Sequence, residues 1–380
     1  MKIVTSGAGL RAGHVLQKML AAMPEAKIVG YHDPAPGHLD MIGGDAIPAY
    51  PSVGDMLAET QPDLFCVFSP NCFHLDQIRE GLEAGVQVFA EKPIVTTMED
   101  SFALAELLAK HGANRVMVGL VLRYSSQMVD LRAAMADGAL GTIASMEANE
   151  HIGPYHGAFF MRDWRRHTKL SGGFMLEKCC HDLDIYNMIA NARPARVASF
   201  GARRSFVPEN APGAGEDASE YHRKASIWES AEDPFTSDGD IIDSQTALIE
   251  YESGASLAFH TNLNVPDEHR RFCVIGSRGM AEGDFLRGYL NVTDARSGKR
   301  LVANDYSANA TNEGHYGADE RMARDVAAFL RDETDTLPVS VLDALEAGIA
   351  ALAIDEARQA KRVVELGDHW ARLDALGLRQ

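Results

Sequence analysis

The chain has 380 residues, 46% of them hydrophobic and 24% charged, and its 54 acidic against 36 basic residues give a formal net charge of −18. This length suits two domains rather than one small core. The excess of acid argues against nucleic acid or an anionic membrane as the main partner, because both attract clustered lysine and arginine. The five cysteines form no Cys-x-x-Cys pair, so we expect no disulfide framework. With no long apolar stretch and no leader pattern, cytoplasmic residence is the default expectation.

The first predicted element is a short apolar strand, Lys2 to Ser6, which leads into a glycine-rich turn and a helical run over 14–22. This order is typical of a dinucleotide-binding fold. The first glycine permits a tight turn, the second lets the backbone approach a pyrophosphate, and the helix N-terminus favours its negative charge. We therefore predict that the cofactor contacts the residues of this turn, namely Gly7, Gly9, Leu10, Arg11 and Ala12.

A second strand is predicted over 26–33, and it ends in Asp33, about twenty residues past the glycine turn. An acid at this place accepts hydrogen bonds from the hydroxyls of the adenosine ribose and repels a 2′-phosphate. On that ground NAD is preferred over NADP. The alternative is a surface aspartate that opens the turn at Pro34.

Strands over 64–68, 86–90 and 115–119 then alternate with helices over 72–84 and 101–111. Such alternation predicts an α/β fold, in which helices cover both faces of a parallel sheet. Ligands of these sheets bind at the carboxyl ends of the strands. Candidate ligand-binding residues follow the strand ends, and they are Ser69, Asn71, Glu91 and Lys92.

The segment from Ser171 to Asp184 predicts a helix that runs to about Asn191. Glu177 and His181 are one turn apart, and Asp184 follows on the same face. A carboxylate in this position fixes the tautomer of the histidine and raises its pKa, which suits a general base. Two alternatives stay open. One is a helix N-terminus whose acids suit its dipole, with a histidine in the core; the other is a metal site that includes Asp182.

The second half of the chain predicts a strand over 142–151, followed by several strands over 196–206 and 241–292 that are joined by tight turns. Short connections of this kind predict a mostly antiparallel sheet. Because the strands over 246–251 and 256–263 carry apolar side chains at most positions, we expect a homodimer or homotetramer built on this sheet. The polar stretch over 207–240 predicts a lid or a solvated loop; residues in it with suitable chemistry for a sugar are Tyr221, His222, Lys224 and Trp228.

Taken together, several motifs resemble those of the glucose–fructose oxidoreductase / inositol dehydrogenase / MocA family. They follow one another in the expected order and cover nearly the whole chain. The motifs are the glycine turn, Ser69-Pro70-Asn71-Cys72-Phe73-His74, Glu91-Lys92-Pro93, the segment 119–124, the segment 137–141, the glycine-led helix with its acid and histidine, and the segment 276–279.

The resemblance implies a Rossmann domain over 1–122, followed over 123–380 by an α+β domain with a large, mostly antiparallel open sheet that binds substrate and forms the oligomer. It also implies NAD(P)-dependent oxidation or reduction of a sugar, polyol or related secondary alcohol. Lys92 is then expected to contact the substrate and the nicotinamide ribose, with a cis peptide bond before Pro93. Catalytic roles fall to Lys92, Glu177 and His181. Lys92 and His181 would converge on the same carbon, and Glu177 would orient the imidazole.

This sequence departs from the family pattern at three places near the helix. The acid is Glu177 where an aspartate is usual, Cys179 stands where a glycine is common, and Lys178 adds a second cation. The division of work between Lys92, Lys178 and His181 therefore stays open.

Further site residues follow from the resemblance. His74 and Arg165 are expected at the cofactor, although a structural ion pair is an equal alternative for Arg165. The expected substrate-binding residues are Lys92, Arg123, Trp164, Lys178, His181 and His315. Two other functions stay open beside a dehydrogenase: a glycoside-cleaving enzyme that retains NAD and oxidises its substrate transiently, and a non-catalytic nucleotide or sugar sensor.

Overall fold

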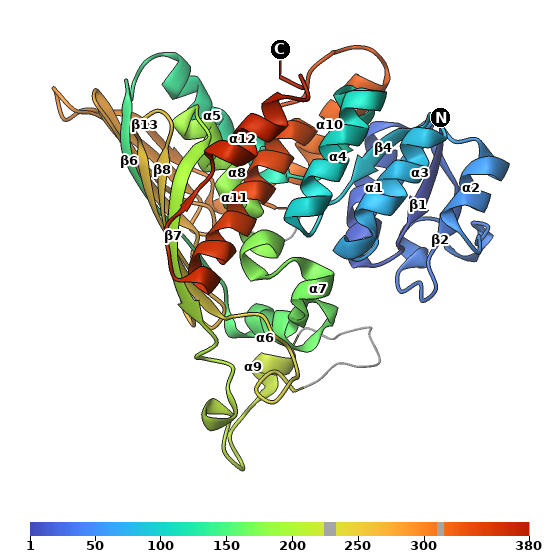
Figure 1. Cartoon of the computed structure of the whole chain (residues 1–380), viewed down its shortest axis with the longest axis horizontal. Coiled ribbons are helices and arrows are strands. Elements are labelled where there is room, and N and C mark those ends of the chain that lie inside the picture. Colours follow the sequence, from blue (N-terminus) through green and yellow to red (C-terminus); the bar gives the residue numbers. More distant parts are fainter. Residues whose placement is uncertain (224–232, 310–314, 380) are drawn as a thin grey trace. The chain divides into compact units, whose positions relative to one another are not determined.

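The computed structural model describes residues 1–223, 233–309 and 315–379, and the chain divides into two compact units (Figure 1). The first unit consists of Met1–Tyr124, Gly317–Gly348 and Ala371–Gln380, and the second of Ser125–Tyr316 and Ile349–Trp370. The expected division was 1–122 and 123–380; in the structure the second unit starts at Ser125, and the chain returns to the first unit twice.

The first unit is built on a five-stranded parallel sheet with the order β2-β1-β3-β4-β5. Its strands are β1 (Lys2–Ser6), β2 (Lys27–His32), β3 (Leu64–Val67), β4 (Gln87–Ala90) and β5 (Val116–Val118). Every residue of β3 is buried, as expected of a strand that is covered on both faces. The order reverses after β2, so the connections that follow the adjacent strands β1 and β3 run in opposite directions along the sheet. This reversal creates the crevice in which such sheets bind ligands.

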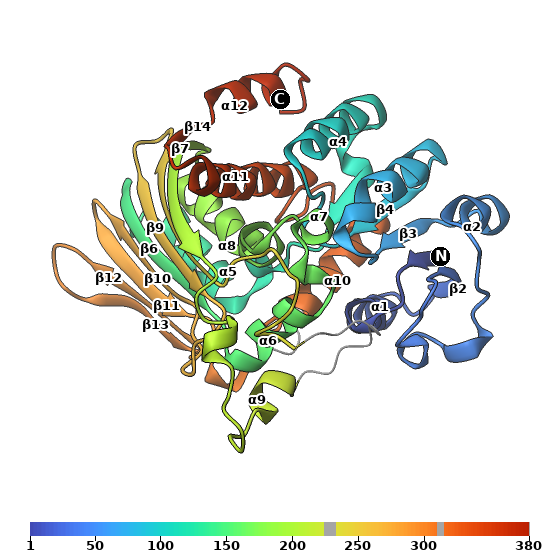
Figure 2. The same ribbon diagram turned by 60° about the horizontal axis from the view of Figure 1, so that its bottom comes forward.

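Helices cover both faces of this sheet (Figure 2). α1 packs against α10 on one face, and α3 packs against α2 and α4 on the other. Right-handed crossovers require this division, because the chain moves one way along the sheet after β1 and the other way after β2. The helices are α1 (Leu10–Ala22), α2 (Val53–Thr60), α3 (His74–Glu83), α4 (Met98–His111) and α10 (Ala318–Leu330).

The second unit contains a nine-stranded sheet with the order β13-β12-β11-β10-β6-β9-β8-β7-β14. Neighbouring strands are antiparallel except for the central pair β6 and β9, which is parallel. The prediction of an α/β protein with a Rossmann sheet and a second, mostly antiparallel sheet is therefore confirmed. The strands are β6 (Ile143–His151), β7 (Pro194–Ala202), β8 (Ser244–Tyr251), β9 (Ser256–Asn262), β10 (Arg271–Gly276), β11 (Gly279–Asp284), β12 (Tyr289–Asp294), β13 (Arg300–Asp305) and β14 (Val364–Glu365).

One face of this sheet is covered by helices, and in the described part of the chain no element lies over the other face (Figures 1 and 2). The open face carries exposed apolar side chains, namely Phe200, Leu248, Ile275 and Met280. The helices of the unit are α5 (Ser126–Ala136), α6 (Pro154–Arg162), α7 (Thr168–Ser171), α8 (Phe174–Ala190) and α9 (Ser219–His222). Two further helices, α11 (Val341–Ala360) and α12 (Gly367–Asp374), carry the chain between the two units.

α8 is buried on nearly every side, including its polar residues Glu177, His181, Asp182 and Asp184. The sequence pattern suggested a polar stripe opposite an apolar one. Both sides are instead inside the protein, because the helix packs between the sheet and the other helices of its unit. Its polar residues therefore meet partners or one another rather than solvent.

Candidate functional site

The glycine turn between β1 and α1 leaves the N-terminus of α1 open. Gly9 is the residue before the helix and has no side chain to cap it, and a Cβ placed on Gly9 would meet nothing within 4 Å. Gly7 has a φ of +90°, and a Cβ there would lie 2.5 Å from the carbonyl carbon of Phe68. Only glycine fits that position. No side chain of Gly9 therefore caps the first backbone N–H groups of α1, and these groups can bind an anionic group such as a pyrophosphate.

Asp33 lies directly after β2 and is tied to this turn. Its Oδ2 accepts a hydrogen bond from the Ala8 N–H at 2.7 Å, and its Oδ1 accepts one from the Ala35 N–H at 2.8 Å. A carboxylate has about four lone-pair sites, so both oxygens keep acceptor capacity for ribose hydroxyls. Together, the open helix N-terminus and this half-buried acid fit a dinucleotide.

The turn after β3 is held by side chains that the sequence had assigned to the cofactor. Ser69 Oγ donates to Gln77 Oε1 at 2.8 Å, and Asn71 is buried in the short helical turn Asn71–Phe73. His74 is buried, with its Nδ1 2.9 Å from the carbonyl oxygen of Pro93 and its Nε2 2.9 Å from that of Ser69. Its ring therefore connects the turn after β3 with the turn after β4.

Glu91 and Lys92 follow β4. The peptide bond between Lys92 and Pro93 is cis, as the resemblance implied. Glu91 is buried, its Oε2 accepts the Lys92 N–H at 3.0 Å, and its Oε1 accepts Arg11 Nε at 2.6 Å. The Glu91 side chain therefore holds the backbone of the next residue, Lys92.

The contacts of Arg11 were not predicted from the sequence. Its guanidinium bonds Glu91 and also forms a two-pronged ion pair with Asp319, at 2.8 Å and 3.0 Å. Burial alone lowers the pKa of Arg11, but the charges and hydrogen bonds of the two carboxylates outweigh it and raise the pKa.

Arg123, which was expected at the substrate, is buried. Its guanidinium donates to the Pro338 carbonyl oxygen at 3.1 Å and forms an ion pair with Asp343 at 3.1 Å.

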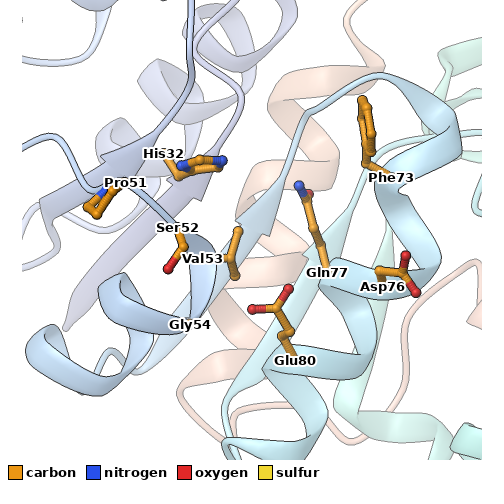
Figure 3. A pocket seen from close by; sticks show the side chains of 9 residues that line it. All are labelled: His32, Pro51, Ser52, Val53, Gly54, Phe73, Asp76, Gln77 and Glu80. Carbon is orange, nitrogen blue, oxygen red and sulfur yellow. The ribbon is translucent and has the colours of Figure 1, made fainter.

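A cavity of about 320 Å³ lies in the first unit between the end of β2 and the helices α2 and α3 (Figure 3). Burial, reinforced by the charge of Asp76, raises the pKa of Glu80 in its wall. Sequence reasoning missed this cavity, because its residues come from segments that are separate in the sequence. The lining residues are His32, Pro51, Ser52, Val53, Gly54, Phe73, Asp76, Gln77 and Glu80.

In the second unit, Glu177 and His181 both lie buried on α8. Glu177 Oε1 accepts a hydrogen bond from Arg165 Nε at 3.0 Å, which is the ion pair that was the alternative to a cofactor contact. The Arg165 guanidinium also stacks on the Trp164 ring, 4.3 Å from its centroid. The His181 ring lies 5.6 Å from that of His315. The structure thus brings His315 beside His181, although the two are 134 residues apart in the sequence.

Lys178 belongs to a buried chain of alternating charges. Its Nζ lies 3.2 Å from Glu150, which lies 2.9 Å from Arg270, and Arg270 donates to both oxygens of Asp182 at 2.8 Å and 2.6 Å. Burial raises the pKa of Asp182 to about 6, although the charge of Arg270 opposes the shift. Sequence reasoning missed Glu150 and Arg270, because no local pattern indicates which buried ions will meet.

The loop over 207–240 contains four residues that were expected to suit a sugar. Of the loop candidates, Tyr221 packs edge-on against Phe235 with ring centroids 5.0 Å apart, and His222 Nε2 lies 3.9 Å from Asp233. Lys224 and Trp228 lie outside the described residues.

Among the residues that the structure describes, no group of three or more His, Cys, Asp or Glu side chains is arranged to hold a metal ion. No helix of the described ranges is long and apolar enough to cross a membrane.

Comparison with known proteins agrees with this architecture. Residues 1–120 match the GFO/IDH/MocA oxidoreductase family with an NAD-binding Rossmann fold, and residues 128–282 match the GFO/IDH/MocA C-terminal domain. Protein YteT of Bacillus subtilis is 26% identical over 266 residues, which cover 60% of this chain and 62% of that protein. The match thus spans less than two thirds of that relative.

Two further proteins are similar at lower identity or in fold. The scyllo-inositol 2-dehydrogenase (NAD(+)) of Bacillus subtilis is 23% identical over 280 residues, 72% of this chain and 70% of that protein. The crystal structure of a myo-inositol dehydrogenase from Corynebacterium glutamicum is 22% identical and covers 97% of this chain and 99% of its own, with a TM-score of 0.69.

Proposed function

Because the chain belongs to the GFO/IDH/MocA oxidoreductase family, we propose that it transfers a hydride between NAD and a secondary hydroxyl of a sugar, glycoside or cyclitol. The single observation that carries the proposal is the open N-terminus of α1 with Asp33 bonded to the Ala8 N–H of the same turn. This arrangement supplies N–H donors for a pyrophosphate and an acid for a ribose.

The proposed roles follow from the chemistry of removing hydrogen from a C–H and an O–H. The nicotinamide ring, when bound, accepts the hydride. His181 takes the hydroxyl proton as general base. Glu177, one helical turn earlier and buried on α8, orients the imidazole and favours its charged form. The Lys92 ammonium stabilises the developing alkoxide electrostatically.

NAD is proposed in preference to NADP. Asp33 is a carboxylate at the position that meets the adenosine ribose, and it would repel a 2′-phosphate. Both its oxygens accept backbone N–H groups, which hold the carboxylate against the glycine turn. Dissociation constants of NAD and NADP measured by calorimetry test this choice, and tighter binding of NADP would contradict it.

The second copy of this chain is the proposed protein partner. The open face of the nine-stranded sheet carries Phe200 at 75% exposure and Leu248 at 54%. Exposed apolar side chains on a sheet face are typical of subunit interfaces. A homodimer or homotetramer is therefore proposed, and a mass of one chain in light scattering would contradict it.

The catalytic roles are tested by substitution. General-base help is worth about 10²–10⁴-fold, so His181→Ala is expected to lower kcat by about that factor while NAD still binds. Lys92→Met is expected to lower kcat as well, whereas its control Lys110→Met, at an exposed position of α4, retains full turnover. Unchanged turnover in His181→Ala would remove His181 from the mechanism.

A further inference from the structure

Arg11 occupies a position where a cation is not favoured by the helix itself. It lies in the first turn of α1, where the helix dipole presents positive charge and favours acids. The sequence suggests a phosphate ligand at this point of a glycine turn. The structure instead places the guanidinium between two carboxylates, those of Glu91 and Asp319.

The charges around Arg11 do not make an anion site. One guanidinium and two carboxylates have a net charge of −1. Asp319 is 1% exposed, and it faces both terminal nitrogens of Arg11. A phosphate would have to compete with this two-pronged pair, which is among the stronger hydrogen-bonded pairs in proteins.

Glu91 connects Arg11 with the turn that carries Lys92. One carboxylate oxygen of Glu91 accepts Arg11 Nε at 2.6 Å, and the other accepts the backbone N–H of Lys92 at 3.0 Å. Gly119 closes the space behind, because a Cβ there would lie 2.8 Å from Glu91 Oε1. The orientation of this carboxylate therefore fixes the Lys92 backbone.

Asp319 anchors the other end of Arg11. It lies in the first turn of α10, where the dipole of that helix stabilises its charge. α10 packs against α1, and a second ion pair, Lys18 with Glu320, joins the same two helices without contacting Glu91. The chain thus offers a matched control for any effect of the helix contact alone.

We propose that Arg11 is a positioning residue for Lys92 that acts through the Glu91 carboxylate, and not a ligand of the cofactor phosphates. The inference rests on the proposed function of Lys92 at the substrate hydroxyl. Asp319 holds the guanidinium, the guanidinium holds Glu91, and Glu91 holds the Lys92 amide. Removing Arg11 leaves two neighbouring carboxylates that repel each other, and Glu91 then turns away from Lys92.

The test compares Arg11→Met, Arg11→Lys and the control Lys18→Met in the full chain. The chemical shift and hydrogen exchange of the Lys92 amide are followed by NMR with ¹⁵N-lysine labelling, and NAD binding by calorimetry. In Arg11→Met we expect the amide proton to move upfield and exchange faster, because it loses its carboxylate acceptor, while the dissociation constant of NAD is retained. Displacement of Lys92 by about 1 Å is expected to lower kcat by about 10²-fold with KM for NAD unchanged.

The controls separate the possible outcomes. Lys18→Met should leave the amide signal and kcat as in the parent, and Arg11→Lys, which keeps the charge but not the fork, should restore part of the loss. Should Arg11→Met fail to fold, Arg11→Lys and Asp319→Asn replace it. Weaker NAD binding by about tenfold or more with an unchanged Lys92 amide would overturn the proposal, and so would a loss of stability alone. Because the amide signal needs no substrate, a failure of the proposed enzymatic function does not mask the result.

Discussion

His151 gives a stability prediction that follows from its surroundings. It is 8% exposed at the end of β6, and its ring centroid lies 4.9 Å from that of His260 and 4.8 Å from that of His269. Asn262 Nδ2 lies 3.3 Å from His151 Nδ1 and 3.1 Å from His260 Nε2. An amide group can donate to both nitrogens only when neither carries a proton. This part of the sheet therefore favours neutral imidazoles.

The size of the effect follows from the pKa of His151. Burial, followed by the charges of His260, His269 and Arg271, lowers this pKa to about 4, and Glu150 opposes the shift. In the unfolded chain the pKa is about 6.5. Between these values the unfolded chain binds more protons, so the free energy of unfolding falls as the pH falls. At about 1.4 kcal/mol for each pKa unit, the loss contributed by His151 is about 3 kcal/mol.

The perturbation is His151→Phe, which keeps a ring but cannot titrate. Loss of the Asn262 contact lowers the free energy of unfolding by nearly the same amount at every pH. It therefore shifts the curve of stability against pH without changing its slope. Urea unfolding of both proteins at a series of pH values, at one protein concentration, measures the difference. We expect the variant to gain about 3 kcal/mol relative to the parent from pH 7 to pH 4. Curves that stay parallel over this range would refute the reasoning.

Three further predictions concern other parts of the chain. Asp33→Ala is expected to raise the dissociation constant of NAD about tenfold or more in calorimetry, because hydrogen bonds to a charged acceptor are lost; an unaltered affinity would contradict the ribose role. Arg270→Met should lower the free energy of unfolding in urea by about 3–5 kcal/mol, since it leaves Asp182 and Glu150 as buried acids. The exposed control Arg300→Met should change it by less than about 0.5 kcal/mol, and an equal loss in both variants would refute the buried-charge argument. Leu248→Glu places a charge on the open sheet face and should reduce the mass in light scattering, whereas an unchanged oligomer would remove that face from the interface.

Local patterns predicted those features that depend on residues close together in the sequence. The glycine turn requires Gly7 because the backbone of Phe68 is near, and the strand–turn–helix order alone indicates such a turn. The start of α8 after two glycines was likewise visible, and this helix ends at Ala190, one residue before the position predicted. The open sheet followed from short connections such as the turn at Gly254.

Contacts across long sequence separations were not predictable in the same way. Arg11 and Asp319 are 308 residues apart, and Arg270 and Asp182 are 88 residues apart. The sequence shows that these residues are charged, but their partners are set by how helices and strands pack. For the same reason the sequence could not show that Lys178 lies beside Glu150. The return of residues 317–348 to the first unit also depends on packing, here of α10 on α1.

The central claim is that this chain moves a hydride from a secondary alcohol carbon to NAD. Incubation with NAD and a panel of cyclitols, sugars and glycosides that carry deuterium at their carbinol carbons tests it directly, with mass spectrometry of the cofactor as the readout. We expect deuterium in the reduced cofactor with at least one member of the panel, and a loss of this transfer in His181→Ala. NAD that binds but acquires no deuterium from any of these alcohols would contradict the claim.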